Sequence, residues 1–225
     1  MYVTIARAAG VLLIGLLAAP VMAAAQTAPA QSEERSRTQG IKETDRFIKA
    51  GNNAHASIAN ARLESKHTLD MYNKLVTQPS KNMKGDYKKL LGAVDDMKEE
   101  VADARLEISN MRASGDTYFT GRETTIKAIQ DQQLQSTAAT RLATSQKDFD
   151  TVLTSLRAAG DALEVFRKEL ADQITFLGSD LTPAMTALKP AADKLNAQGD
   201  EALGKIDAAN AALRAYLDGL KASQS

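Results

Sequence analysis

A seven-residue apolar repeat between Leu134 and Leu177 constrains the fold of this chain more than any other feature of its sequence. Because an α-helix turns once per 3.6 residues, such a repeat places one apolar stripe along one side of a helix. The stripe spans roughly 50 Å at about 1.5 Å per residue, so other helices must cover it. Its members are Leu142, Phe149, Leu156, Leu163, Leu170 and Leu177, with Val152, Ala159, Phe166 and Ile174 between them.

Two helices are predicted before this one. The first covers Ile41–Val76, and a Gly-Asn-Asn triplet at 51–53 interrupts the middle of its apolar face. The strongest turn signal in the chain, with Pro, Ser, Asn and Gly, follows at Thr77–Gly85. The second helix begins at Asp86, a suitable N-cap residue. Its apolar residues alternate at steps of three and four, and they are Tyr87, Leu90, Val94, Met97, Val101, Ala104, Ile108 and Met111.

The remaining helix boundaries rest on glycine and proline. Gly115 and Gly121 flank an aromatic pair, and we expect a kink or a short break of the second helix there. No Gly or Pro marks residues 131–136, so the sequence leaves open whether the second and third helices are continuous. A fourth helix is predicted from Pro183, a residue that suits the first helical position. Pro190 lies inside it and removes one hydrogen bond, so we expect a bend but no end.

Together these patterns predict an all-α fold, an elongated antiparallel bundle of three to four long coiled-coil-like helices over residues 41–222. Helices of these lengths would give a rod of about 55–65 Å. The interrupted first helix is expected to cover the bundle least well. We hypothesise that the other three helices form the stable unit and that the first can loosen, with the weakest protection from hydrogen exchange across Gly51–Ala61.

The N-terminal residues have a different character. Residues 1–25 read as a secretory signal peptide, because a basic residue precedes the apolar run Ala8–Met22 and the small residues Ala23-Ala24-Ala25 suit a signal peptidase. Cleavage is predicted before Gln26, and a retained membrane anchor is the alternative. Residues 26–40 contain no apolar side chain larger than alanine, so a disordered linker is predicted there.

The charge balance and the lack of cysteine exclude several classes of function for this chain. The chain holds 28 Lys plus Arg against 28 Asp plus Glu, and a nucleic-acid partner would need a basic surplus. It contains no cysteine, which excludes disulfides and thiolate metal sites. An exported chain without cysteine fits a bacterial periplasm, or the cell exterior, as its location.

One pair of residues has the spacing of a metal-ligand motif. Glu64 and His67 match Glu-x-x-His, which puts both side chains on one helix face in di-iron bundles. Such a site needs the motif twice. The only other histidine, His55, has Asn52 three residues before it. We therefore interpret this pair as part of a solvated helix surface and predict no metal site.

Two further clusters have a functional and a structural interpretation. Lys81, Lys84, Lys88 and Lys89 could contact an anionic membrane surface, or they could surround an ordinary soluble turn, which is the interpretation we favour. The pair Tyr118-Phe119 lies between two glycines. It could form a binding notch, but we expect it to fill the bundle where glycine leaves room.

The second half of the chain resembles a known family. The run Asp172-Gln173-Ile174-Thr175-Phe176-Leu177, a polar triplet and then Leu181 resemble a pattern of exported helical bacterial proteins of unknown function. In that family an Asp-Gln-Val-Leu-Phe-Leu run meets a Lys-His-Asn-Leu-Asn turn. The segments Tyr118-Phe119 and Val165-Phe166 also resemble its pattern. The resemblance implies export and a helical fold, and implies no mechanism.

The chain departs from that pattern in two places. Gly178-Ser179-Asp180 stands where the family has Lys-His-Asn, and a Trp expected after the Tyr-Phe pair is absent, with Gly121 nearby. A role of the basic and imidazole groups in the family cannot be shared by this chain.

The sequence suggests no nucleophile–base pair and no phosphate-binding loop, so we predict no enzyme and no catalytic, cofactor-binding or metal site. The predicted function is an exported structural or protein-interaction module of the bacterial cell envelope. Its predicted partner is another envelope protein or a second copy of the chain, and nucleic acid is excluded. Alternatives are a lipid-associated module on a membrane surface and a periplasmic chaperone-like binder.

Overall fold

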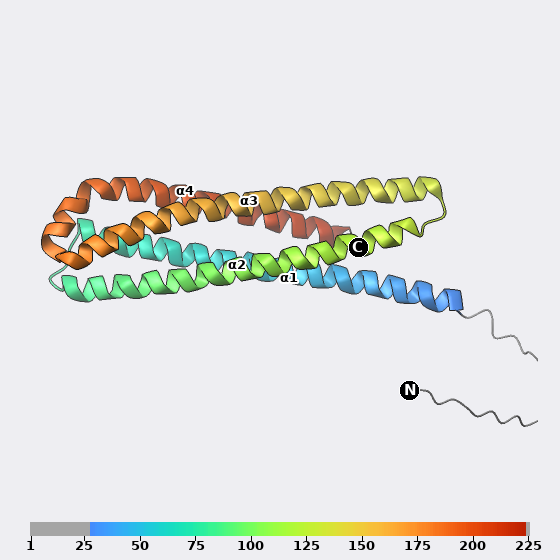
Figure 1. The fold of residues 1–225 in the computed structure, drawn as a ribbon, viewed down its shortest axis with the longest axis horizontal. Coiled ribbons are helices and arrows are strands. Elements are labelled where there is room, and N and C mark those ends of the chain that lie inside the picture. The colour runs from blue at the N-terminus through green and yellow to red at the C-terminus, as the bar shows by residue number, and fades with distance from the viewer. Residues whose placement is uncertain (1–27, 224–225) are drawn as a thin grey trace, which may run out of the picture.

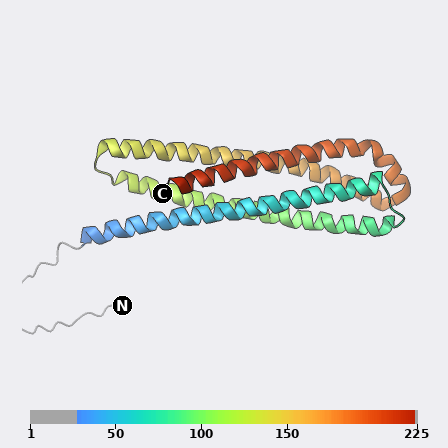
Figure 2. The same cartoon turned by 180° about the vertical axis from the view of Figure 1, so that it is seen from behind.

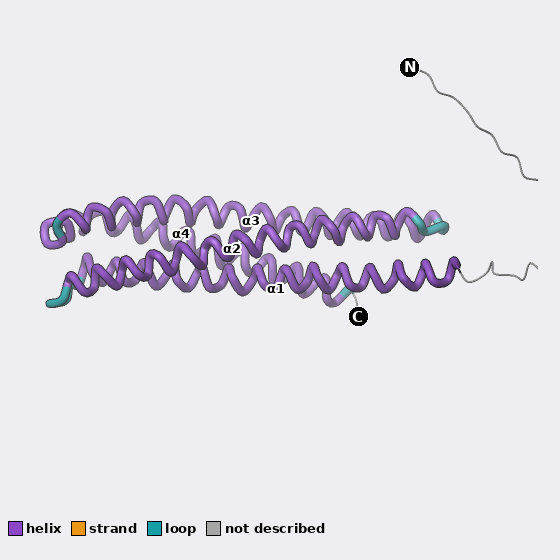
Figure 3. Tube along the Cα trace, turned by 60° about the horizontal axis from the view of Figure 1, so that its bottom comes forward, coloured by secondary structure: helices purple, strands orange, loops and turns teal. Residues whose placement is uncertain are grey.

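The chain folds into a bundle of four long helices, seen in a computed structural model that describes residues 28–223. Figure 1 shows α1 (Ala28–Thr77), α2 (Met83–Lys127), α3 (Gln132–Ser179) and α4 (Leu181–Ala222), each running antiparallel to the one before. The tube in Figure 3 shows no strand in this part of the chain. The predicted all-α antiparallel bundle is confirmed. At about 1.5 Å per residue, the helices are about 63–75 Å long, somewhat longer than the predicted rod.

Side-chain caps define the turns. At the first turn, the side chain of Asn82 accepts a hydrogen bond from the backbone N–H of Gly85 at 3.2 Å. At the second, Asp131 accepts from the N–H groups of Gln133 and Leu134, both at 2.9 Å, so α2 and α3 are separate helices. Helix α4 continues through Pro190, as predicted.

Helix α1 begins earlier than the sequence predicts. It starts at Ala28, so the prediction of a disordered linker over 26–40 is wrong for residues 28–40. Residues 31–39 are rich in Gln, Glu and Arg and contain no Gly or Pro. Such residues prolong a helix that the bundle has already nucleated. The predicted signal peptide, 1–25, and residues 26–27 lie outside the described residues.

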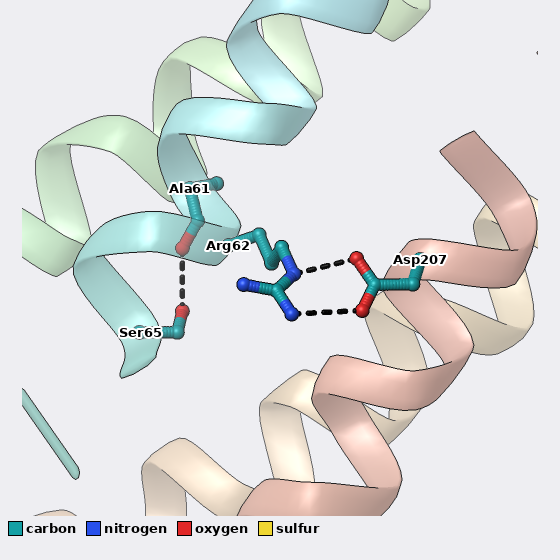
Figure 4. A network of polar contacts seen from close by, with 4 residues as sticks. All are labelled: Ala61, Arg62, Ser65 and Asp207. Carbon is teal, nitrogen blue, oxygen red and sulfur yellow. Dashed lines mark hydrogen bonds and ion pairs between the residues drawn. The ribbon is translucent and has the colours of Figure 1, made fainter. Parts of the chain in front are cut away.

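Helix α1 packs along both α2 and α4, as the opposite views in Figures 1 and 2 show. Arg62 of α1 and Asp207 of α4 form a bidentate ion pair on the surface, with Nη2 and Oδ2 2.9 Å apart (Figure 4). In the same turn of α1, the hydroxyl of Ser65 donates to the carbonyl of Ala61 at 2.6 Å, so this buried side chain is satisfied within its own helix.

The prediction that α1 covers the bundle least well is wrong. Phe47 and Ala54 are fully buried. Gly51 is buried between them, and a Cβ atom there would lie 2.5 Å from Cδ2 of Leu217. Glycine at this position therefore allows α1 and α4 to approach closely. The least extensive contact between neighbouring helices is that of α2 with α3.

Helix α2 continues without a break through Gly115 and Gly121 to Lys127, so of the predicted kink or short break, the break is wrong. Gly115 is buried, and its missing side chain leaves room for the ring of Phe149 on α3. The glycine thus serves the packing of two helices and does not end one.

Candidate functional site

A long groove lies between α3 and α4. Its volume is about 1180 Å³. It forms because α3 and α4 diverge towards one end of the bundle, where α4 ends at Ala222 short of the turn that joins α2 to α3 (Figures 1 and 2). The last turns of α2, from Tyr118 to Ile126, also line the groove.

The three helices contribute different chemistry to the groove. Helix α4 contributes small residues, Ala212, Ala215 and Gly219 among them. Helix α3 contributes a row of hydroxyls and two charges along its exposed side. The row is Thr137, Thr140, Arg141, Thr144, Asp148 and Thr151. Apolar residues of the three helices and of the α2–α3 turn complete the lining, and they are Ile126, Ile129, Leu134, Leu142, Val152 and Leu220.

A cluster of five aromatic rings packs beneath the groove, and two of its members, Tyr118 and Tyr216, line it. It joins Phe47, Tyr118, Phe119, Phe149 and Tyr216, with neighbouring ring centroids 5.0–6.1 Å apart. Tilted and edge-on pairs at these distances add to the free energy of burial. Tyr118 and Phe119 are 7% and 5% exposed, so the pair fills the bundle as expected. Tyr118 also lines the groove.

The charges that line the groove have no ion-pair partner among residues 39–223, whose side chains the structure describes. Arg122 lies over the ring of Tyr118, with its guanidinium carbon 5.5 Å from the ring centroid. Arg141 and Asp148 are exposed and lie seven residues apart on one side of α3. Salt bridges occur elsewhere on the bundle but not at these three residues. The groove therefore presents two positive charges and one negative charge.

The one polar pair inside the groove does not resemble a catalytic pair. Ser145 and Tyr216 are hydrogen-bonded through their hydroxyls at 3.2 Å. Burial raises the pKa of Tyr216 to about 12, and the nearby carboxylates of Asp148 and Asp150 act in the same direction. Tyr216 stays protonated at neutral pH, so it cannot remove the proton of Ser145 as a general base.

The model of one protein family matches most of the chain. The family model described as a protein of unknown function, DUF2959, matches residues 33–219. The chain belongs to the DUF2959 family. The match covers nearly the whole bundle, whereas the resemblance seen in the sequence was confined to its second half. No curated protein and no solved structure matches the chain.

The Asp172–Leu177 run of this DUF2959 chain contains a buried polar residue at the other end of the bundle. Gln173 is 4% exposed and accepts a hydrogen bond from the hydroxyl of Tyr72 on α1. Its amide donates to Glu169 at 3.0 Å, and Glu169 accepts from Lys194 of α4 at 2.9 Å. The hydrogen bonds from Lys194 and then Gln173 lower the pKa of Glu169.

This network links α1, α3 and α4. The apolar pattern of the sequence predicts Tyr72 on the inner face of α1 but does not predict its hydrogen-bond partner. Since a buried amide must find hydrogen-bond partners, Gln173 fixes how far α3 can slide along α1. Its role here is structural.

The two buried tyrosines predict a loss of stability at high pH. Burial raises the pKa of Tyr72 to about 12, with a further contribution from Glu169, and the pKa of Tyr216 is also about 12. An unfolded tyrosine titrates near pH 10. The folded state therefore holds both protons more tightly, and this contribution to stability, complete below pH 10, is lost as pH rises to 12. Denaturant titrations between pH 9 and 12 should show this fall.

The control is the double variant Tyr72→Phe/Tyr216→Phe. It should start from a lower stability at neutral pH, because the Oε1 acceptor of Gln173 loses its donor. Its stability should nevertheless fall less steeply between pH 10 and 12. A slope equal to that of the unmodified protein would assign the loss to other groups.

The other residues singled out in the sequence do not meet at a site in this DUF2959 chain. His67 is exposed on α1. Among residues 39–223, no three His, Asp or Glu side chains gather closely enough to hold a metal ion. The lysines at 81, 84, 88 and 89 are all exposed around the α1–α2 turn, at the end of the bundle opposite the groove. None of the described helices combines the length and apolar character needed to cross a membrane.

Proposed function

We propose that this DUF2959 protein is an exported, non-catalytic helical bundle of the cell envelope that binds a protein partner. The observation that carries the proposal is the groove between α3 and α4. It is a long concave surface with an apolar interior and unpaired charges, and its one polar pair has no general base. A surface of this kind suits the recognition of another chain.

Export is supported by the sequence of residues 1–25, which has the basic, apolar and small-residue parts of a signal peptide in that order. The absence of cysteine and the balanced charge agree with an envelope protein that does not bind nucleic acid.

Cell fractionation with intact-mass analysis tests the proposal. Cells that express the full chain should hold it in the periplasmic or secreted fraction, with a mass that begins at Gln26. Substitution of Ala23 and Ala25 by bulky residues should block this cleavage and leave a longer, membrane-bound chain. A chain that keeps residue 1 and stays in the cytoplasm would contradict the proposal.

A lipid-associated module is the second candidate, and the four exposed lysines at the α1–α2 turn favour it. Each could add about 1 kcal/mol of attraction to an anionic membrane. Three further observations oppose it, namely the zero net charge, the low aromatic content and Asp86 among the lysines. Co-sedimentation with anionic liposomes at low and physiological salt would decide between the two candidates.

A further inference from the structure

We propose that the groove between α3 and α4 is a docking site for an acidic amphipathic helix of a partner protein. This inference rests on the proposed function and specifies the partner's chemistry. It follows from the shape of the groove, from the chemistry of its two walls and from its charges.

The shape matches a helix. On α3 the lining extends from Leu134 to Val152, about 27 Å at about 1.5 Å per residue, so the groove is elongated along the bundle. It runs between α3 and the last turns of α4, and apolar residues of α2, α3 and α4 line it. A helix in this place would pack as the helices of the bundle already do.

The wall formed by α4 allows a close approach. Ala212, Ala215 and Gly219 lie three or four residues apart on one side of the helix, and all three line the groove. A Cβ atom added at Gly219 would meet no atom within 4 Å, so this part of the groove is open. A helix backbone can therefore lie close to α4.

The wall formed by α3 favours a helix over an acyl chain. Thr137, Thr144 and Thr151 each donate to the carbonyl four residues earlier, at 2.9, 3.1 and 3.0 Å. Their oxygens remain acceptors along the groove. The polar side chains that flank the apolar stripe of an amphipathic helix can hydrogen-bond to them, whereas an acyl chain would remove them from water without a partner.

The charges select an acidic helix. Arg122 and Arg141 line the groove near the α2–α3 turn, and Asp148 is the one acid that lines it. Since none of the three is paired within the described residues, a partner rich in Glu would gain two attractive contacts for one repulsive contact. A lysine-rich partner would gain one attractive contact and meet two repulsive contacts.

Two labelled peptides test the proposal by fluorescence anisotropy with the purified protein. Both are about 18 residues long with the same leucine stripe, and their flanking positions are all Glu in one and all Lys in the other. The Glu peptide should bind at least about tenfold more tightly. The variant Arg122→Glu/Arg141→Glu should reverse this order. Its control, Arg157→Glu/Lys168→Glu, makes the same change of charge at exposed positions of α3 outside the groove and should preserve it.

A second pair of variants tests the position of the peptide. Gly219→Trp fills the groove and should abolish binding of the Glu peptide. Gly204→Trp is the control, because Gly204 lies on the same helix outside the groove and also has no atom within 4 Å of an added Cβ. Circular dichroism and thermal unfolding should show that both variants remain folded.

Three results would overturn the proposal. The first is equal binding of the two peptides, or a loss of binding that is the same in the groove and control variants. The second is binding of a fluorescent fatty acid that Gly219→Trp abolishes while neither peptide binds, which would identify an acyl ligand. The third is a dimer in sedimentation velocity that Arg122→Glu/Arg141→Glu dissociates, which would make a second copy the occupant. None of these results bears on export, which fractionation tests separately.

Discussion

Replacing Leu163 with Ala should lower the free energy of unfolding by about 2–5 kcal/mol. Leu163 is 6% exposed and belongs to the seven-residue repeat of α3. It borders a void of about 50 Å³ in the middle of the bundle, to which all four helices contribute side chains. The space left by the substitution would join this void. Because long helices held together along their whole length cannot easily collapse into it, we expect a loss in the upper part of the range.

The matched control is Lys168→Ala, five positions further along α3 and exposed. It should change the free energy of unfolding by no more than about 0.5 kcal/mol. Urea denaturation of the two variants measures both values, and the denaturant dependence should stay the same if both still unfold in one step. Equal losses at Leu163 and Lys168 would mean that the repeat does not form the core.

The repeat itself explains why the fold could be predicted. A period of seven that holds at six successive positions leaves no alternative to a long helix with one covered face, and the same pattern recurs in α2 and α4. The helix ends were harder. The turn before α3 contains no Gly or Pro, and its only signal is Asp131, whose side chain accepts hydrogen bonds from the N–H groups of Gln133 and Leu134 in the first turn of the helix. The start of α1 at Ala28 could not be predicted, because the first residues of the helix are polar and carry no apolar repeat.

The groove could not be predicted, because it depends on how far two helices diverge. The sequence predicts the lengths of α3 and α4 but not the angle between them. Its residues gave a weak signal, since Ile126, Ile129 and Leu134 extend the apolar pattern into the region of the α2–α3 turn without a predicted contact. Gln173 was likewise visible as part of a resemblance, but only the structure shows that it meets Tyr72 across the bundle.

The role of a glycine inside a helix is also hard to predict from the sequence. The same residue can end a helix, allow close packing against a neighbouring helix or lie on the surface. Gly115 and Gly160 both lie inside long helices. At Gly160, an added Cβ would meet no atom within 4 Å. At Gly115, it would lie 2.7 Å from Cε1 of Phe149 and 3.1 Å from Cε2 of Phe47.

The same substitution should therefore have opposite effects at the two sites. Gly160→Ala should stabilise the protein by about 0.5–1 kcal/mol, because alanine loses less backbone entropy in a helix and costs no contact. Gly115→Ala gains the same stabilisation from backbone entropy, but its methyl group must displace a ring within the aromatic cluster. Overpacking of this kind costs about 1–3 kcal/mol, so we expect a net loss of about 1–2 kcal/mol.

Thermal and urea unfolding of the two variants measure the difference. Because Phe149 also packs against Tyr216 on the groove, Gly115→Ala should in addition alter the near-ultraviolet circular dichroism of the tyrosines, whereas Gly160→Ala should leave it unchanged. Stabilisation by both substitutions would show that the aromatic cluster can yield without cost. The groove would then have a soft base, and its shape in this structure would be a poor guide to the shape of its partner.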